Sequence, residues 1–214
     1  MFIFNDMPVQ VESSVLSPLM DVCVSTLGHM RDDGFAKGLQ PNRRPIRFVG
    51  TAVTVRIPHL DSTAVHYAVD HLRQGDVLVV DTSGDHDRSC FGGLVAFTAK
   101  ARGSVGAVID GSINDFDEAL DYDFPIFSRG YSPLTTRILG IEGGINVPVT
   151  IGGSIVDPGD VVFADSDGVA FVKPADVPHI ASELKKKEAA EVPARAAISE
   201  GGSLAEFSGA ASYF

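Results

Sequence analysis

Three aspartates follow runs of residues that are predicted to be buried strands. Asp81 ends the run VLVVD, Asp110 ends VGAVID, and Asp115 lies shortly after the second run. Because the carboxyl ends of strands in open α/β sheets border the crevice where ligands bind, we expect these carboxylates near such a crevice. Carboxylate oxygens suit hard divalent cations such as Mg2+ or Mn2+. The spacing therefore indicates a metal role for Asp115, with a plain N-cap of a helix that begins at Phe116 as the alternative.

A glycine-containing loop and a helix are predicted between the two strands. The loop TSGDHDRSC precedes FGGLVAFTAKAR, which has apolar periodicity and strong helix formers. A crossover helix of this length returns the chain to the same edge of the sheet, so the strands should be parallel in a β-α-β unit. Backbone amides at the helix start, from Phe91, Gly92, Gly93 and Leu94, are predicted to bind the carboxylate of a small anionic substrate.

Two other pairs of residues are candidates for chemistry. Cys90 lies at the start of the same helix, four residues after His86. A helix N-terminus lowers the pKa of a thiol, so these residues could form a nucleophile pair; the alternative is a small half-buried residue under the loop. His66 and Asp70 lie one helical turn apart. They could be a metal ligand with its orienting carboxylate, or a surface contact.

Length and composition are typical of one globular domain. The 214 residues show no shift in composition, which predicts a single domain over residues 1–214. The formal net charge of -11 argues against binding to nucleic acid or to an anionic membrane, because phosphate contacts need clustered Lys and Arg. The two cysteines lack zinc-site spacing, and the sequence contains neither a signal peptide nor a membrane-spanning apolar run. We therefore expect a reduced, cytoplasmic protein.

The remaining elements are predicted from local pattern. Residues 1–40 are expected to form a helical region, and the β-branched alternation over 46–56 predicts a strand. From 145 to 172 the turns GG, DPGD and DSDG separate short β-rich pieces. Residues from 174 to 214 are expected to form a helical arm that packs on a neighbouring subunit. We expect a break or kink near Pro193, because proline inside a helix removes a hydrogen bond and clashes with the preceding turn.

The order of these segments resembles a known family, the proteins related to regulator of ribonuclease activity A (RraA) and the 4-hydroxy-4-methyl-2-oxoglutarate aldolases, which are class II pyruvate aldolases. The matching segments are GTAVTV, GDVLVVD, FGGLVAFTAKARGSVGAVIDG, FPIFSRG and NVPVTIGGSIVDPGDVVFADSDGVAFV. The resemblance implies an α/β fold of the swivelling ββα (RraA-like) type, with a central β-α-β unit, a β-rich C-terminal half and a C-terminal helical arm. It also implies a homotrimer or hexamer in which sites lie between subunits.

The resemblance further implies particular site residues. In the aldolases an Arg-Asp pair follows the second strand: the Asp binds the metal, and the Arg holds the substrate and stabilises the enolate. Here the pair is Asn114-Asp115. Gly93 stands where the aldolases carry an acidic residue that orders metal-bound water. The family's Glu from the C-terminal helix of a neighbouring subunit is matched by Glu188, with Glu191 as the other candidate.

The missing Arg leaves three functions open. Asn carries no charge, and removing one fixed donor to a developing oxyanion typically costs ~3 kcal/mol. Arg88 or Arg129 could replace the lost cation. The leading interpretation is a lyase dependent on Mg2+ or Mn2+ that cleaves a hydroxy-oxo diacid or decarboxylates an oxaloacetate-like acid. The alternatives are a non-catalytic regulatory binding protein and a divergent enzyme that catalyses hydration or isomerisation.

Overall fold

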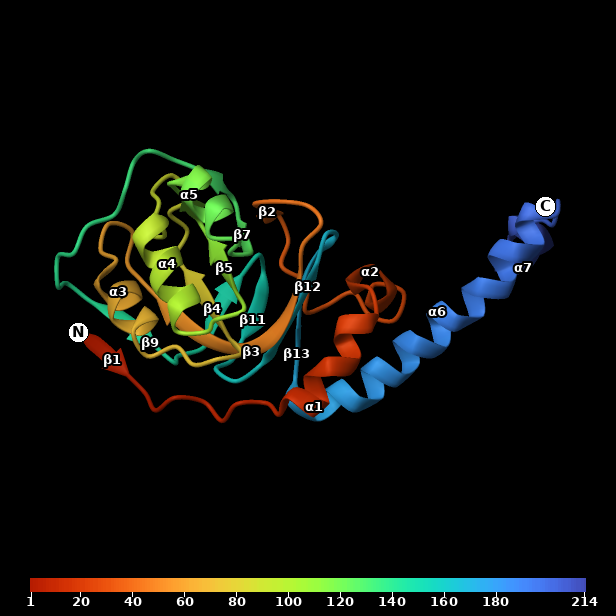
Figure 1. The fold of residues 1–214 in the computed structure, drawn as a ribbon, viewed down its shortest axis with the longest axis horizontal. Helices are drawn as coiled ribbons and strands as arrows, with labels where there is room; N and C mark the ends of the chain where they lie inside the picture. The colour runs from red at the N-terminus through yellow and green to blue at the C-terminus, as the bar shows by residue number, and fades with distance from the viewer.

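The predicted β-α-β unit forms the centre of the structure. The computed structural model describes residues 1–214 (Figure 1). Strand β4 (Asp76–Asp81), helix α4 (Gly93–Ala101) and strand β5 (Gly106–Asp110) follow one another, and the two strands are parallel, with Asp81 opposite Asp110. Both strands are almost wholly buried. Continuous apolar runs such as VLVV are what a parallel strand covered on both faces requires.

Strand β3 (Arg47–Arg56) joins this unit to the β-rich half of the chain. Its residues 51–56 pair with β4, and its residues 47–51 pair antiparallel with β12. The full sheet has nine strands. Seven follow in the order β1 (Phe2–Phe4), β9 (Gly143–Ile145), β3, β4, β5, β7 (Ile126–Ser128) and β2 (Gln40–Pro41); β12 (Val161–Asp165) pairs with β3, and β13 (Gly168–Val172) pairs with β12. The strand predicted over 46–56 is therefore confirmed as a central element.

The two faces of the central sheet are covered by different layers. Helices α3 (Thr63–Val69) and α4, with α5 (Phe116–Asp121) beside α4, lie over one face; the hairpin of β10 (Val149–Ile151) and β11 (Ser154–Val156) packs on the other (Figure 1). Leu78 and Val80 pack under the helices, whereas Val77 and Val79 pack under the hairpin. Because side chains alternate along a strand, Asp81 continues the hairpin-facing series.

The N-terminal region predicted to be helical over residues 1–40 is helical only between residues 13 and 27, in short pieces, whereas residues 2–4 form strand β1. The helical pieces are α1 (Ser13–Leu16), the 3-10 helix η1 (Ser17–Asp21) and α2 (Val24–Leu27). Val22 and Cys23 are extended. The backbone N–H of Cys23 donates to Glu188 at 2.7 Å, and that of Val24 donates to Asp165 at 2.9 Å. Glu188 and Asp165 thus accept hydrogen bonds from amides that would otherwise donate within a continuous helix, which explains why the helix is interrupted at Val22 and Cys23.

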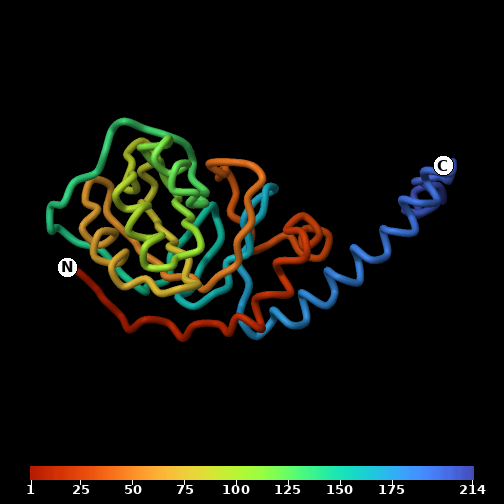
Figure 2. The backbone as a smooth tube through the Cα atoms, in the orientation of Figure 1, coloured from red at the N-terminus to blue at the C-terminus, as the bar shows by residue number.

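The C-terminal arm is one long helix rather than a broken one. Helix α6 (Val177–Ser199) packs its first turns on β12, β13 and the N-terminal helices, then leaves the body, with α7 (Leu204–Ser208) and the 3-10 helix η3 (Ala210–Tyr213) at its tip (Figure 2). It continues through Pro193, so the predicted break is wrong. Pro193 lies in the exposed part of the helix, where water can satisfy the carbonyl that loses its partner. None of the helices is sufficiently long and apolar to span a membrane.

Candidate active site

Asp115 lies just before α5, but its side chain does not cap that helix. Its backbone is left-handed, with φ 53° and ψ 47°. Its Oδ2 atom accepts a hydrogen bond of 2.9 Å from the backbone N–H of Gly93, the first residue of α4. A left-handed conformation costs a residue with a Cβ about 1–2 kcal/mol, and here it turns the carboxylate toward the neighbouring helix. Asp115 is thus the N-cap residue of α5 by position, but its side chain makes no capping hydrogen bond to that helix. The side chain lies exposed at the N-terminal end of α4.

Asn114 connects the loop before α4 to the segment after β6 (Ser112–Ile113). Its backbone N–H donates to the carbonyl of Phe91 at 3.1 Å, and its side-chain Oδ1 accepts a hydrogen bond from the hydroxyl of Ser89. The Nδ2 group makes no hydrogen bond within the chain and lies beside Gly92. Asn114 therefore presents a neutral donor next to Asp115. Sequence reasoning missed Ser89, for which only its position just before the FGG segment was a signal.

Gly92 and Gly93 leave open the space in which these side chains lie. A Cβ on Gly92 would be 2.7 Å from Oδ2 of Asp115, and a Cβ on Gly93 would be 2.1 Å from Oε2 of Glu118. Neither glycine has a positive φ. A side chain at either position would therefore clash with these atoms, although the backbone conformation would allow one.

Two of the four amides predicted to bind a substrate carboxylate are free. The N–H of Phe91 donates to the Ser89 hydroxyl at 3.4 Å, and that of Gly93 donates to Asp115. The N–H groups of Gly92 and Leu94 make no hydrogen bond within the chain. The start of a helix carries a partial positive charge, so this end of α4 is open to an anion.

The two candidate replacement cations are bound to other carboxylates. Arg88 forms an ion pair with Asp85 at 2.8 Å, and Arg129 forms one with Asp110. Burial by itself raises the pKa of Asp85, but the hydrogen bonds from Arg88 and Asp87 outweigh it and hold the pKa below its usual value. No hydrogen bond or ion pair links either arginine to the Asn114-Asp115 pair. The prediction that Arg88 acts beside Asn114 and Asp115 is therefore not supported within one chain.

The three strand-end aspartates do not converge. Asp110 accepts a hydrogen bond of 2.8 Å from Gly152 as well as the contact from Arg129, and Asp81 accepts 2.7 and 3.2 Å hydrogen bonds from Ser83 and Thr150. Gly152 and Thr150 belong to the hairpin layer, whereas Asp115 meets α4 on the other side of the sheet. No three His, Cys, Asp or Glu side chains surround one point. The three carboxylates therefore do not border one crevice within a single chain.

Glu188 lies with the N-terminal helices and not with Asp115. Its Oε1 atom accepts hydrogen bonds from the backbone of Cys23 at 2.7 Å and from the hydroxyl of Thr26 at 2.8 Å. Glu191 pairs with Arg195 in the exposed part of the arm. Figure 1 shows α6 leaving the body on the side away from α5. A glutamate from this helix can therefore reach an Asp115 site only in another copy of the chain.

The other two candidate pairs are not formed. Cys90 is buried, and burial raises the pKa of its thiol to about 12. His86 lies 3.9 Å from Asp110, with no hydrogen bond to Cys90. A buried thiol with a raised pKa is a poor nucleophile, so the packing alternative holds for Cys90. Asp70 pairs with Arg102 at 2.8 Å instead of orienting the nearby histidine.

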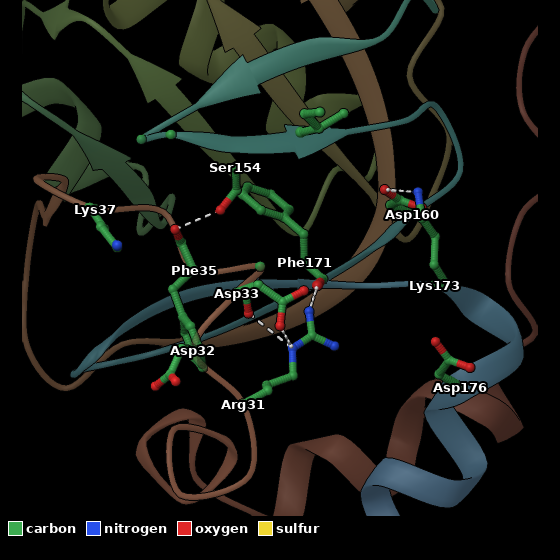
Figure 3. Close-up of a pocket in the computed structure, with 14 residues that line it drawn as sticks. Arg31, Asp32, Asp33, Phe35, Lys37, Ser154, Asp160, Phe171, Lys173 and Asp176 are labelled. Carbon is green, nitrogen blue, oxygen red and sulfur yellow. Dashed lines mark hydrogen bonds and ion pairs between the residues drawn. The ribbon is translucent and has the colours of Figure 1, made fainter.

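Asp115 is exposed to solvent in a single chain. Five pockets of about 320 to 700 Å³ lie elsewhere, and no residue from 91 to 94 or from 114 to 118 lines them. Figure 3 shows the pocket of about 560 Å³ between the loop 31–37 and the β10–β11 hairpin. There Arg31 donates to the carbonyl of Phe171 at 3.0 Å, and Lys173 forms an ion pair with Asp160. These internal pairs hold two of the basic side chains of the pocket wall.

Comparison with known proteins confirms the resemblance. Residues 17–171 match the model of the RraA-like family, which is described as Aldolase/RraA. The chain belongs to the RraA-like family. A protein of Halalkalibacterium halodurans, provisionally named 4-hydroxy-4-methyl-2-oxoglutarate aldolase, is 36% identical over 162 residues, which are 76% of this chain and 77% of that protein.

Two solved structures have the same RraA-like architecture. An uncharacterized protein from Pseudomonas syringae is similar with a TM-score of 0.78 and 27% identity, covering 94% of this chain and 97% of the other. Streptomyces coelicolor RraAS2, described as an unusual member of the RNase ES inhibitor RraA protein family, has a TM-score of 0.77 and 26% identity, covering 89% and 98%. The predicted fold is thus confirmed. The RraA-like match includes every candidate site residue except Glu188 and Glu191.

Proposed function

We propose that this RraA-like protein is a divalent-metal-dependent carbon–carbon lyase that acts on a small oxo acid. The reaction is either aldol cleavage of a hydroxy-oxo diacid or decarboxylation of an oxaloacetate-like acid. The observation that carries the proposal is the Asp115 carboxylate, which a left-handed backbone turns toward the open amide end of α4. The provisional aldolase name of the Halalkalibacterium halodurans relative supports an aldolase-type lyase.

The residues present fit a hard cation such as Mg2+ or Mn2+. Mg2+ usually keeps several waters and needs only one or two protein carboxylates. Asp115 is exposed and has an oxygen, Oδ1, without a partner, and the missing Cβ of Gly92 leaves space beside Oδ2. A substrate carboxylate bound at the same helix end would meet the Asp115 carboxylate. At 4 Å two such charges repel by about 4 kcal/mol near a protein surface, which a divalent cation would offset.

Asp115 would hold the cation, which when bound polarises the carbonyl and carboxylate of a pyruvyl unit and accepts electron density as the adjacent bond breaks. The free N–H groups of Gly92 and Leu94 would bind the substrate carboxylate. The Nδ2 group of Asn114, held by the Ser89 hydrogen bond, would orient the substrate's carbonyl oxygen. Decarboxylation requires no removal of a hydroxyl proton. It therefore depends less on the missing family groups than aldol cleavage does.

The proposed assembly is a homotrimer or hexamer in which a second copy closes each site. In one chain Asp115 is exposed, and the neighbouring apolar side chains of Leu94 and Phe97 on α4 are 75% and 52% exposed. A partner surface over α4 would bury these side chains and exclude water from the site. The partner's glutamate at position 188 or 191 would then be the residue that approaches Asp115 from outside.

The test combines metal binding with product release. Asp115→Ala should abolish Mn2+ binding measured by calorimetry while leaving the thermal unfolding transition in place, because the residue lies on an exposed loop. Wild-type protein should release pyruvate from at least one of a set of oxo acids, in a manner that chelator stops. Unchanged Mn2+ affinity in the variant would remove the site assignment.

A second function has one observation in its favour. Arg88 and Arg129 are both held in ion pairs, so neither of these two candidates is free to replace the family Arg. A regulatory binding protein needs no such charge, and an enzyme for hydration or isomerisation needs it less. Metal binding without pyruvate release from any oxo acid would favour the altered enzyme. Absence of both would favour the binding protein.

A further inference from the structure

The space beside Gly93 is filled by a carboxylate from a different helix. Glu118 lies in the first turn of α5 and points back to the start of α4. A Cβ on Gly93 would lie 2.1 Å from Oε2 and 2.8 Å from Cδ of Glu118. Gly93 is part of α4, where glycine is less favourable than alanine by about 0.5–1 kcal/mol, and its φ is not positive. The absence of a side chain at Gly93 therefore provides the space that the carboxylate of Glu118 occupies.

Glu118 does not act as a cap of α4. The N–H of Gly93 is already bonded to Asp115, and Glu118 accepts no hydrogen bond from the backbone of residues 92–95. Its only hydrogen bond comes from the hydroxyl of Tyr122, at 3.1 Å, one turn further along α5. The ring of Tyr122 packs edge-on against Phe97 of α4, with the ring centroids 5.4 Å apart. Tyr122 thus holds the glutamate against the end of α4.

We propose that Glu118 supplies the second carboxylate of the cation site, beside Asp115 at the start of α4. This inference rests on the proposed function. Oδ2 of Asp115 accepts the hydrogen bond of the Gly93 N–H, and Oε2 of Glu118 lies where a Cβ of Gly93 would be, so both carboxylates face Gly93. Two carboxylates with remaining water ligands are a sufficient protein donor set for Mg2+ or Mn2+. Glu118 would thus supply to the site the acidic side chain that is absent at position 93.

Neither Asp115 nor Glu118 forms an ion pair with a basic side chain of this chain. The carboxylate of Asp115 bonds only to the Gly93 N–H, and that of Glu118 only to the Tyr122 hydroxyl. The Lys100 ammonium on α4 donates to the Tyr122 carbonyl and not to these carboxylates. Apart from the helix end, nothing in the chain neutralises the two carboxylates. A bound divalent cation would do so.

The experiment measures the Mn2+ affinity of the full-length protein by calorimetry, with thermal unfolding as a check on the fold. Glu118→Gln should weaken Mn2+ binding by 10- to 100-fold. Asp117→Asn is the matched control, because Asp117 is an exposed acid on the same helix turn with no side-chain partner. The affinity of this variant should stay within about threefold of wild type, as expected for a screened charge. Glu118→Ala combined with Gly93→Asp should recover part of the lost affinity by restoring an acid from α4.

The outcomes separate this inference from the proposed function. If Asp115→Ala abolishes binding but Glu118→Gln binds Mn2+ as the wild type does, Glu118 is not part of the site and the proposed function stands. If Glu118→Gln and Asp117→Asn weaken binding equally, the effect is one of general charge and the inference is overturned. If neither Asp115→Ala nor Glu118→Gln changes the affinity, the proposed function fails as well.

Discussion

Replacing Gly93 by alanine should separate stability from metal binding. The new Cβ would overlap Oε2 of Glu118 at 2.1 Å and crowd its Cβ at 3.2 Å. Since Glu118 is exposed, its side chain can rotate away, which breaks its hydrogen bond with Tyr122 at a cost of about 0.5–1 kcal/mol. Alanine in place of glycine in a helix contributes up to about 1 kcal/mol in the opposite direction. The net change in the free energy of unfolding is therefore close to zero, and Tm should move by no more than about 2 °C.

Metal affinity should respond very differently to the same substitution. A displaced Glu118 no longer reaches the cation, so Gly93→Ala should weaken Mn2+ binding by about 10- to 100-fold, the range found when a supporting carboxylate of a metal site is removed. Calorimetry with Mn2+ measures this loss. The variant Gly93→Ala with Glu118→Gln should bind no more weakly than either single variant, because both remove one interaction. Additive losses, or an unchanged affinity in Gly93→Ala, would refute the reasoning.

Three further predictions concern other parts of the chain. Asp61→Ala should lower the free energy of unfolding in urea by about 3 kcal/mol, because the buried carboxylate accepts hydrogen bonds from Thr63, Leu139 and Ile141. Burial by itself raises the pKa of Asp61, but these hydrogen bonds outweigh it and hold the pKa well below its usual range. The stabilisation by this carboxylate is thus complete above about pH 4 and lost at lower pH. If the difference in unfolding free energy between Asp61→Ala and wild type did not narrow in acid, this prediction would be contradicted. Iodoacetamide at pH 8 should modify the half-exposed Cys23 and spare the buried Cys90, as mass spectrometry would show; alkylation of Cys90 in folded protein would be the opposing result. Asn114→Arg should raise pyruvate release at least tenfold with Mn2+ affinity retained, and normal metal binding without increased release would show that the lost charge was not limiting.

The sequence predicted the elements of the fold where local pattern and tertiary packing agree. The buried run before Asp81 and the helix after Gly92 form as expected because a covered parallel sheet requires them. Prediction failed where distant side chains act on the backbone. The break at Cys23 depends on Glu188 and Asp165, which are more than a hundred residues away in sequence. No local pattern reports such contacts.

The sequence indicated that Asp115 would lie near the start of α4, but not which side chains would surround it. Side chains alternate along β4 and β5, which places Asp81 and Asp110 on the hairpin-facing side of the sheet. The strand-end argument ignored this alternation and therefore did not separate these two residues from Asp115. Glu118 was not selected because an acid in the first turn of a helix is common. Only the space at Gly93 shows that its carboxylate reaches another helix.

Solvent exposure of Asp115 bears on where catalysis can occur. Fixed dipoles stabilise a developing charge strongly only when water is excluded from the site. In one chain the carboxylate is exposed and the apolar side chains of Leu94 and Phe97 lie beside it, 75% and 52% exposed. Full burial of such a side chain contributes about 1.5–3 kcal/mol, so covering both would favour association at the same place where it removes water. The residues that would close the site are thus also residues that would stabilise its proposed assembly, and an isolated chain should bind the cation while lacking the enclosure that turnover requires.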